Sequence, residues 1–137
     1  MVKELVHDPM RLAVKSVPAT KADTDVIRDL KDTLAAHRAT CAGMAANMIG
    51  VNKNIIIAAV GAGALVMVNA RITAKKGAYE TEEGCLSLLG GPRKTTRYEQ
   101  IDVSYEDERF VKRTGRFTGW TAQIIQHELD HVNGILI

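Results

Sequence analysis

The chain has 137 residues, of which 46% are hydrophobic and 25% are charged, and its formal net charge is +2 at pH 7. This length and composition are typical of one hydrophobic core, so we expect a single domain over residues 1–137. The nearly balanced charge and the scattered basic pairs exclude a strongly basic surface, and we expect no nucleic-acid partner.

The N-terminal residues 1–9 carry charges and lack the apolar run of a signal peptide. The longest apolar tract, residues 55–68, is too short to span a membrane and is broken by a glycine-rich turn, so we expect a buried hairpin and no membrane partner. Cys41 and Cys85 could pair, but one disulfide is a poor framework for a chain of this size. A reducing compartment, the cytoplasm, is therefore favoured.

A long helix is predicted first, from an N-cap at Asp23 to about Ala39, because apolar residues such as Leu30 and Leu34 recur near helical spacing. The other elements expected before the last helix are buried strands over 54–60 and 65–72 about a turn at 61–63, a loop at 90–92, a half-buried strand over 100–105, a turn at 106–109 and a return strand over 110–117.

The C-terminal part of the chain carries an H-E-x-x-H pattern at residues 127–131. A helix is predicted there, because Gly119 suits its start, Gly134 suits its end and no proline lies between them. On that helix His127 and His131 stand one turn apart on one face, so both imidazoles can reach a single metal ion. Apolar residues surround most of the helix, which predicts a place in the middle of the fold.

A catalytic metal site needs a third protein ligand and keeps a fourth position for a water, whose pKa the metal lowers towards neutrality. Cys85 is the best upstream candidate for that ligand, and Glu128 would sit beside the ion. Two other interpretations stay open on these residues alone. Cys85 can be a small buried hydrophobe, and the two histidines can be core or surface residues without a metal.

Three stretches of sequence occur in a particular order: Gly43-Met44-Ala45-Ala46, then Glu83-Gly84-Cys85-Leu86-Ser87, then Gln126-His127-Glu128-Leu129-Asp130-His131. Together they resemble the three signature motifs of peptide deformylases. The likeness covers essentially the whole chain, and the second and third motifs are complete.

The resemblance implies an α+β fold in which antiparallel β-strands pack around a central C-terminal metal-binding helix, with a long N-terminal helix. It implies hydrolysis of the N-formyl group from the initiator methionine of new polypeptides, so N-formylmethionyl peptides are the expected partners. By motif, Cys85, His127 and His131 would hold one divalent ion. The native ion of the family is usually Fe2+, and Zn2+, Ni2+ or Co2+ can substitute.

The resemblance also implies roles for residues around the ion. Glu128 would act as general base and acid, taking a proton from the attacking water and delivering one to the departing amine. Leu86 would donate its backbone N–H to the developing oxyanion. Substrate contacts are expected from four residues: Gly43, Met44, Met48 and Arg97.

The first motif departs from the family pattern, which is G-x-G-Φ-A-A-x-Q with Φ apolar and a final glutamine that donates a hydrogen bond to the formyl oxygen. This chain has Cys41 in place of the first glycine and Met48 in place of the glutamine. A thioether has no N–H to offer, and the neighbouring Asn47 starts from a different backbone direction. Loss of such a donor costs on the order of a hundredfold to a thousandfold in turnover, so we expect reduced or altered activity.

Two alternatives follow from the same residues. In the first, the chain is a weakened deformylase-like protein that binds metal and formylated peptides without efficient turnover. In the second, it is an unrelated H-E-x-x-H peptidase, although residues 83–87 would then have no role. The apolar tail at residues 134–137 predicts a core contact, an added strand or a homodimer contact, and we expect no ribosome docking through a helix beyond it.

Overall fold

The computed structural model describes residues 1–85 and 87–137. Within them the chain forms an antiparallel sheet of five strands whose spatial order follows the sequence. The strands are β1 (Gly43–Ala45), β2 (Ile55–Val60), β3 (Gly63–Cys85), β4 (Leu88–Glu106) and β5 (Lys112–Thr118). The helices are α1 (Pro9–Leu12), α2 (Thr24–Ala36) and α3 (Gly119–Val132), with the 3-10 turns η1 (Lys21–Asp23) and η2 (Ala46–Ile49).

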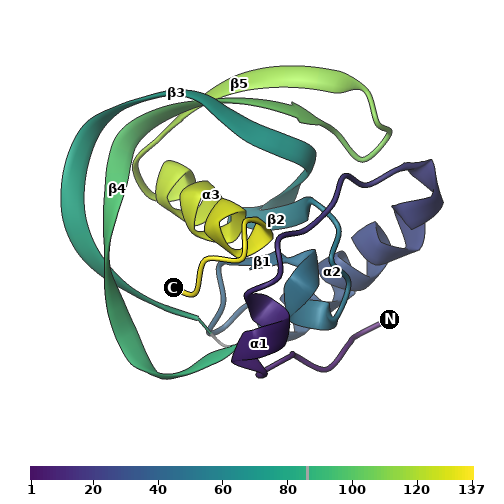
Figure 1. Ribbon diagram of the computed structural model, residues 1–137. Helices are drawn as coiled ribbons and strands as arrows, with labels where there is room; N and C mark the ends of the chain where they lie inside the picture. Colours follow the sequence, from purple (N-terminus) through teal and green to yellow (C-terminus); the bar gives the residue numbers. More distant parts are fainter. Residues whose placement is uncertain (86) are drawn as a thin grey trace.

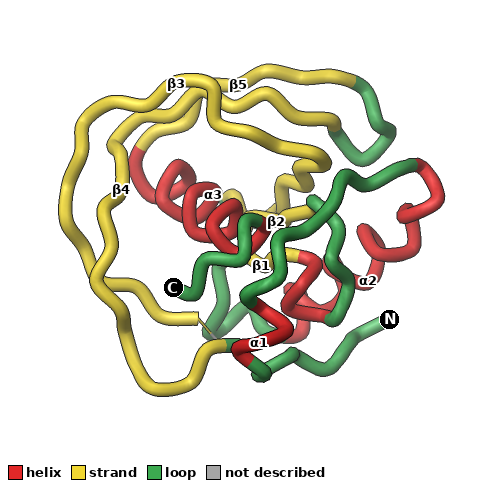
Figure 2. Tube along the Cα trace, in the orientation of Figure 1, coloured by secondary structure: helices red, strands yellow, loops and turns green. Residues whose placement is uncertain are grey.

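The long strands β3 and β4 curve around α3, which lies inside their arch (Figure 1). The short strands β1 and β2 lie beside α3, and the N-terminal helices α1 and α2 lie outside the arch (Figure 2). This arrangement confirms the expected α+β class, with antiparallel strands around a C-terminal helix.

Strand β2 is buried on both of its faces, which explains why its sequence is a continuous apolar run. Ile55 and Ile57 pack in one cluster with Leu30 of α2, whereas Ile56 and Ala58 pack in a second cluster with α3. Alternate residues of a strand point to opposite faces, so each face is committed to one helix. The pairing of β2 with β3 confirms the predicted hairpin.

Helix α3 has the predicted ends. Gly119 at its start has φ 59° and Gly134 just beyond it has φ 75°, a backbone conformation that suits glycine. Gln126 fixes the helix to β4, because its side chain accepts from the N–H of Tyr98 and donates to the carbonyl of Tyr98, each at 2.9 Å. Most of the helix is buried as expected, but Trp120 in its first turn is 63% exposed.

Strands β3 and β4, which form a hairpin, are both much longer than the strands that the sequence predicted. Strand β3 continues past Ile72 to Cys85, β4 begins at Leu88 instead of Gln100, and the expected loop at residues 90–92 is part of β4. The middle of β3 is exposed, so its sequence lacks the apolar alternation by which a half-buried strand is recognised. Cys85 therefore lies at the end of a strand.

Two element boundaries differ from those expected, and the C-terminal tail packs against the core. Helix α2 ends at Ala36 instead of Ala39, and the return strand begins at Lys112, which are ordinary errors at element ends. The tail makes the expected core contact through Ile137, which is 7% exposed, while Ile135 is 46% exposed. Among the described residues, no helix combines the length and the apolar character needed to cross a bilayer.

Candidate metal centre and active site

Three side chains from two elements converge at one point beside α3. Cys85 comes from the end of β3, and His127 and His131 come from consecutive turns of α3. One ligand atom of each residue lies within 4.8 Å of the other two, and the two histidine Nε2 atoms are 3.0 Å apart. The structure thus brings together the three residues that the sequence predicted as metal ligands.

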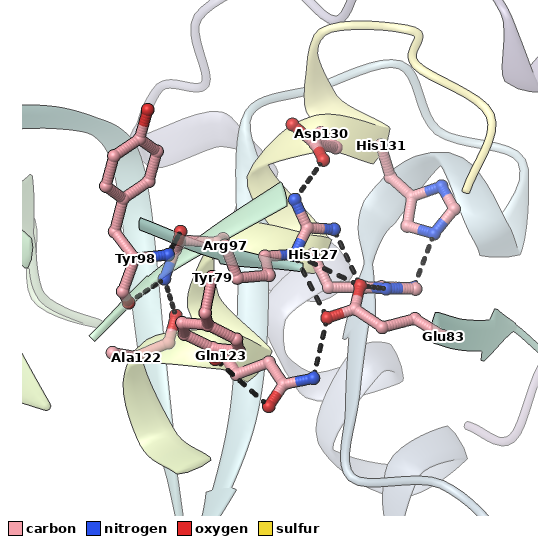
Figure 3. A network of polar contacts seen from close by, with 10 residues as sticks. Tyr79, Glu83, Arg97, Tyr98, Ala122, Gln123, His127, Asp130 and His131 are labelled. Carbon is pink, nitrogen blue, oxygen red and sulfur yellow. Dashed lines mark hydrogen bonds and ion pairs between the residues drawn. The ribbon is translucent and has the colours of Figure 1, made fainter. Parts of the chain in front are cut away.

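A buried carboxylate fixes the orientation of His127 (Figure 3). Glu83 precedes Cys85 by two residues on β3, and its Oε1 lies 2.8 Å from His127 Nδ1. Because an ionised carboxylate can only accept, this contact places a proton on Nδ1 and directs Nε2 towards His131. A histidine whose second nitrogen is held by a carboxylate is typical of metal sites.

Glu83 is itself held by two further side chains. Arg97 donates from Nε and Nη2 to the Glu83 carboxylate at 2.6 to 3.1 Å, and Gln123 Nε2 donates to it at 2.8 Å. Burial on its own raises the pKa of Glu83, but the hydrogen bonds donated to it, first that of His127, outweigh burial and lower the pKa to about 2. Glu83 therefore stays ionised near neutral pH.

Arg97 lies behind the metal-binding residues, which differs from the substrate contact implied by the resemblance. Arg97 is 3% exposed, and its remaining terminal nitrogen, Nη1, donates a hydrogen bond to Asp130 at 2.6 Å. Arg97 is not among the residues that line the neighbouring pocket. Arg97 contacts the carboxylates of Glu83 and Asp130 and holds both in place. No contact among the described residues supports a role for Arg97 in binding substrate.

The facing imidazoles of His127 and His131 suit a cation. Burial lowers the pKa of His131 to about 3, which keeps this ring neutral. Burial also opposes a charge on His127, but hydrogen bonds to Cys85 and Glu83 outweigh it and raise the pKa of His127 to about 10. A positive charge is thus favoured at this point, and a thiolate with two imidazoles is a donor set for zinc or ferrous iron. The residues present fit a divalent metal ion.

Glu128 lies next to these donors with an unsatisfied carboxyl group. Glu128 is 4% exposed, and no hydrogen-bond partner reaches its Oε1 in the described part of the chain. Burial raises the pKa of Glu128 to about 7. A carboxyl group with a pKa near the working pH can both accept and return a proton.

A pocket of about 510 Å³ opens onto these residues, a size in the range of pockets that hold small ligands. Buried residues, including Gly43, Met48 and Glu128, line its inner part. Exposed residues, including Thr40 and Trp120, line its open side. Cys85, His127 and Glu128 line this pocket and are therefore accessible to a ligand from it, whereas His131 lies behind them and is fully buried.

The first motif forms β1 and the η2 turn. Met48, at the family's glutamine position, is 1% exposed, lines the pocket and accepts a hydrogen bond at Sδ from the N–H of Ala45 at 3.4 Å. It offers no donor to a ligand. Gly43 lines the pocket, whereas Met44 packs in the core and is not among the lining residues.

The two cysteines are free, and they differ in character. Cys41 lines the pocket, but its thiol donates to the carbonyl of Gly43 at 2.9 Å, and burial raises its pKa to about 11. It stays protonated and is a poor ligand beside Cys85. Leu86, whose backbone N–H was expected to bind the oxyanion, lies outside the described residues.

Sequence reasoning missed the polar network behind the ligands, which Figure 3 shows. Tyr79 donates to Gln123 at 3.3 Å, and Gln123 donates to Glu83. Two residue spacings in the sequence could have indicated this network. Glu83 lies two residues before Cys85 on one strand, and Gln123 lies four residues before His127 on one helix, so each pair shares a face.

Comparison with known proteins agrees with this geometry. The chain matches the sequence model of polypeptide deformylases over residues 2–137. It belongs to the peptide deformylase family. A peptide deformylase of Clostridium beijerinckii is 53% identical over 137 residues, which is 100% of both chains.

Solved peptide deformylases share the fold. The crystal structure of one from Legionella pneumophila has a TM-score of 0.89 at 29% identity, covering 99% of this chain and 83% of that chain. The structure of one from Acinetobacter baumannii with Met-Ala-Ser bound has a TM-score of 0.89 at 26% identity, covering 99% and 96%. Peptide deformylases are metal-dependent amide hydrolases, and membership makes this chain an enzyme of that class. The interpretation as an unrelated H-E-x-x-H peptidase is therefore wrong.

Proposed function

We propose that this peptide deformylase hydrolyses the formyl amide of N-formylmethionyl peptides at the inner end of the pocket. One divalent ion would be held by Cys85, His127 and His131. The observation that supports the proposal best is Glu128, a buried carboxyl group whose Oε1 has no hydrogen-bond partner among the described residues and which lies beside three converging donors. A buried carboxyl oxygen without a partner costs free energy, and this one is placed to move protons.

The residues divide the reaction between them. A divalent ion would polarise the formyl carbonyl and lower the pKa of water, so that hydroxide is available near neutral pH. Glu128 takes the proton from the attacking water and then protonates the departing amine, which is otherwise a poor leaving group. Glu83 does not touch substrate. It keeps His127 in the orientation that binds the ion, and Arg97 keeps Glu83 in place.

We propose ferrous iron as the native ion, with Zn2+, Ni2+ or Co2+ as substitutes. Iron rests on the family resemblance, because thiolate and imidazole ligands suit all of these ions. The identity of the ion is tested by purifying the protein without oxygen and measuring bound metals by mass spectrometry. Iron at one equivalent supports the proposal, and zinc alone contradicts it.

We further propose that formyl recognition is weakened at Met48. This side chain lines the pocket but can only accept, and its sulfur already accepts from the N–H of Ala45. The formyl oxygen therefore lacks one donor that the family pattern supplies, and turnover is expected to be low. The alternative is a member that binds metal and formylated peptides without efficient turnover.

The test measures formate release from formyl-Met-Ala-Ser by the Fe2+-loaded protein under anaerobic conditions. Glu128→Gln should be slower by about a hundredfold or more, because it removes the proton carrier. Met48→Gln should be faster by about tenfold to a hundredfold, because glutamine is nearly the same size as methionine and restores an N–H donor. Met48→Leu is the matched control, since it keeps the size and offers no donor.

Each outcome separates the interpretations. Turnover by the natural protein that falls in Glu128→Gln supports the deformylase. Turnover by Met48→Gln alone supports the binding protein instead. Equal rates for Met48→Gln and Met48→Leu contradict the missing donor, and formate release by none of the variants contradicts the proposed reaction.

We propose that residues 1–137 form one domain that acts in the cytoplasm on nascent formylated chains, without nucleic-acid or membrane partners. We also propose that a homodimer can form through the apolar tail, where Ile135 is 46% exposed. Sedimentation of the natural protein and of Ile135→Asp tests that assembly.

A further inference from the structure

Asn47 lies in the first motif, at a position that the family pattern leaves free, and its side chain is turned away from the pocket. Met48 beside it lines the pocket, whereas Asn47 is not among the lining residues and is 3% exposed. Both lie in the η2 turn, and successive side chains of a 3-10 turn point about 120° apart. Asn47 therefore does not replace the missing donor for the formyl oxygen, and its buried amide has another use.

The amide nitrogen of Asn47 reaches the C-terminal end of the metal-binding helix. Its Nδ2 donates to the main-chain carbonyl of His131 at 2.8 Å and to that of Leu12, at the end of α1, at 3.5 Å. The carbonyl of His131 lies in the last turn of α3, where carbonyls lack partners within the helix, and it also accepts from the N–H of Gly134 at 3.0 Å. Asn47 thus holds the turn of α3 that carries one of the three candidate ligands.

The imidazole rings of the two candidate ligand histidines differ in what holds them. The Nδ1 of His127 meets Glu83 at 2.8 Å, whereas the Nδ1 of His131 is buried and has no hydrogen-bond partner among the described residues (Figure 3). When Nε2 of a neutral imidazole binds an ion, the ring proton is on Nδ1. His131 therefore presents a buried N–H donor, a kind of group that folded proteins rarely leave unpaired.

Two further buried atoms at this end of α3 complement that donor. The Oδ1 of Asn47 and the Oγ of Ser16 are also buried without a hydrogen-bond partner among the described residues. Ser16 lies here because its N–H donates to the carbonyl of Val132 at 2.8 Å, and Asn47 because of its bond to His131. A buried water typically contacts about three polar groups. One water that accepts from Nδ1–H of His131 and donates to Oδ1 of Asn47 and Oγ of Ser16 satisfies all three atoms.

We propose that Asn47 is a positioning residue for His131, which it holds by a direct hydrogen bond to the main chain and through a buried water to the imidazole. Asn47 then does for His131 what Glu83 does for His127. Both rings are oriented before an ion binds, and such support strengthens metal binding. The inference rests on the proposed function for the set of metal ligands, and it does not depend on the substrate.

The test compares the metal affinity of two variants that lose the same kind of contact. Asn47→Leu keeps the branched shape of the side chain and removes both polar atoms. Asn54→Leu is the matched control, because Asn54 also donates to a main-chain carbonyl, that of Ala70 at 3.2 Å, and also has a buried Oδ1 without a described partner. In competition with a chelator, Asn47→Leu should bind Co2+ about tenfold to a hundredfold more weakly than the natural protein, and Asn54→Leu should bind it equally well. Equal affinities in the two variants overturn the proposal.

Urea denaturation of the metal-free proteins checks that both variants fold, and a second readout needs no variant. In the NMR spectrum of the Zn2+-loaded natural protein, the Nδ1–H proton of His131 should give a resonance with a nuclear Overhauser contact to water. The Nδ1–H proton of His127, which faces Glu83, should give one without it. Absence of the contact at His131 overturns the buried water.

The failure of this inference differs from the failure of the proposed function. If the natural protein releases no formate but Asn47→Leu still binds Co2+ more weakly than Asn54→Leu, the proposed reaction fails and the role of Asn47 stands. If the natural protein releases formate and the two variants bind Co2+ equally, only the role of Asn47 fails. If the natural protein binds no Co2+, the set of metal ligands is wrong and both proposals fail.

Discussion

At the scale of single residues, Glu83 shows how a side chain without a place at the substrate can control a metal site. Its carboxylate meets His127 at 2.8 Å and receives Arg97 at 2.6 to 3.1 Å. The residue is 9% exposed, so these contacts are made largely out of water. An ionic hydrogen bond to a ligand histidine fixes the orientation of its ring and strengthens it as a donor.

Glu83→Gln should therefore weaken metal binding while the protein remains folded. The amide keeps the size and one acceptor for His127 but loses the charge, and changes of this kind reduce metal affinity about tenfold to a hundredfold. Competition with a chelator measures the metal affinity. Glu82→Gln is the matched control, because Glu82 is the adjacent exposed carboxylate. Equal affinities in the two variants would contradict the role given to Glu83.

The metal ligands could be predicted from the sequence because the chemistry of their spacing is local. His127 and His131 lie one turn apart on any helix, and Cys85 lies in a complete motif. Glu83 and Arg97 were beyond prediction as a pair, because the strand register does not place them opposite each other. In the structure Glu83 pairs with Arg93 across the hairpin and Arg97 with Tyr79, so the contact depends on how the long side chain crosses the sheet.

At the scale of elements, the packing of β1 against α3 places Glu128. A side-chain carbon added to Gly43 of β1 would lie 2.7 Å from Ile124 Cγ2, 2.9 Å from the carbonyl oxygen of Ile57 and 3.1 Å from Glu128 Oε2. These distances are shorter than normal contacts, so glycine sets how closely strand and helix approach. The first motif thus acts on the catalytic carboxylate as well as on the pocket.

Gly43→Ala should reduce stability and displace Glu128. Overpacking of a buried site costs about 1 to 3 kcal/mol, and the displaced carboxylate should lower kcat more than it raises KM. Gly63→Ala is the control, because its added carbon meets only the carbonyl oxygen of Val60 at 3.7 Å. Urea denaturation and formate release measure the two effects. Gly43→Ala with the stability and kcat of Gly63→Ala would show that the close approach is not needed.

The same scale explains where prediction of the fold succeeded and where it failed. The hairpin of β2 and β3 and the helix α3 were recognised because burial on both faces and glycines at both ends leave marks in the sequence. The extension of β3 beyond Ile72 was missed because its pairing with β4 is made by backbone groups while its side chains are largely exposed. Backbone pairing leaves no pattern in side-chain type.

At the scale of the whole molecule, the network around Glu83 makes stability depend on acidity. The folded-state pKa of Glu83 is about 2 and its ordinary value is 4.5. A depressed carboxyl pKa adds stability that is present above pH 4.5 and is lost as the pH falls through 2. The full difference between the two pKa values corresponds to about 3 to 4 kcal/mol.

Metal-free protein should accordingly lose more stability between pH 4.5 and pH 2 than the metal-free Glu83→Gln variant, whose residue 83 does not titrate. Urea denaturation at several pH values in this window measures the difference. The comparison must be made without metal, because protonation of His127 and His131 would release an ion over a similar range. Parallel pH profiles for the two proteins would show that Glu83 is not held as its contacts indicate.

Binding of a divalent ion joins β3 to α3 through Cys85 and the two histidines, and therefore should stabilise the whole fold. An ion present at a thousand times its dissociation constant contributes about 4 kcal/mol, since the converging site exists only in the folded chain. For a domain of this size that corresponds to a rise in Tm of about 10 °C or more. Chelation should reverse the rise in the natural protein and have little effect on Cys85→Ser.

Cys41→Ser is the matched control, because Cys41 lines the same pocket outside the group of three donors, and it should respond to chelation as the natural protein does. If Cys41→Ser lost the response and Cys85→Ser kept it, the ion would be bound by the other thiol, and the assignment of the third ligand would be wrong.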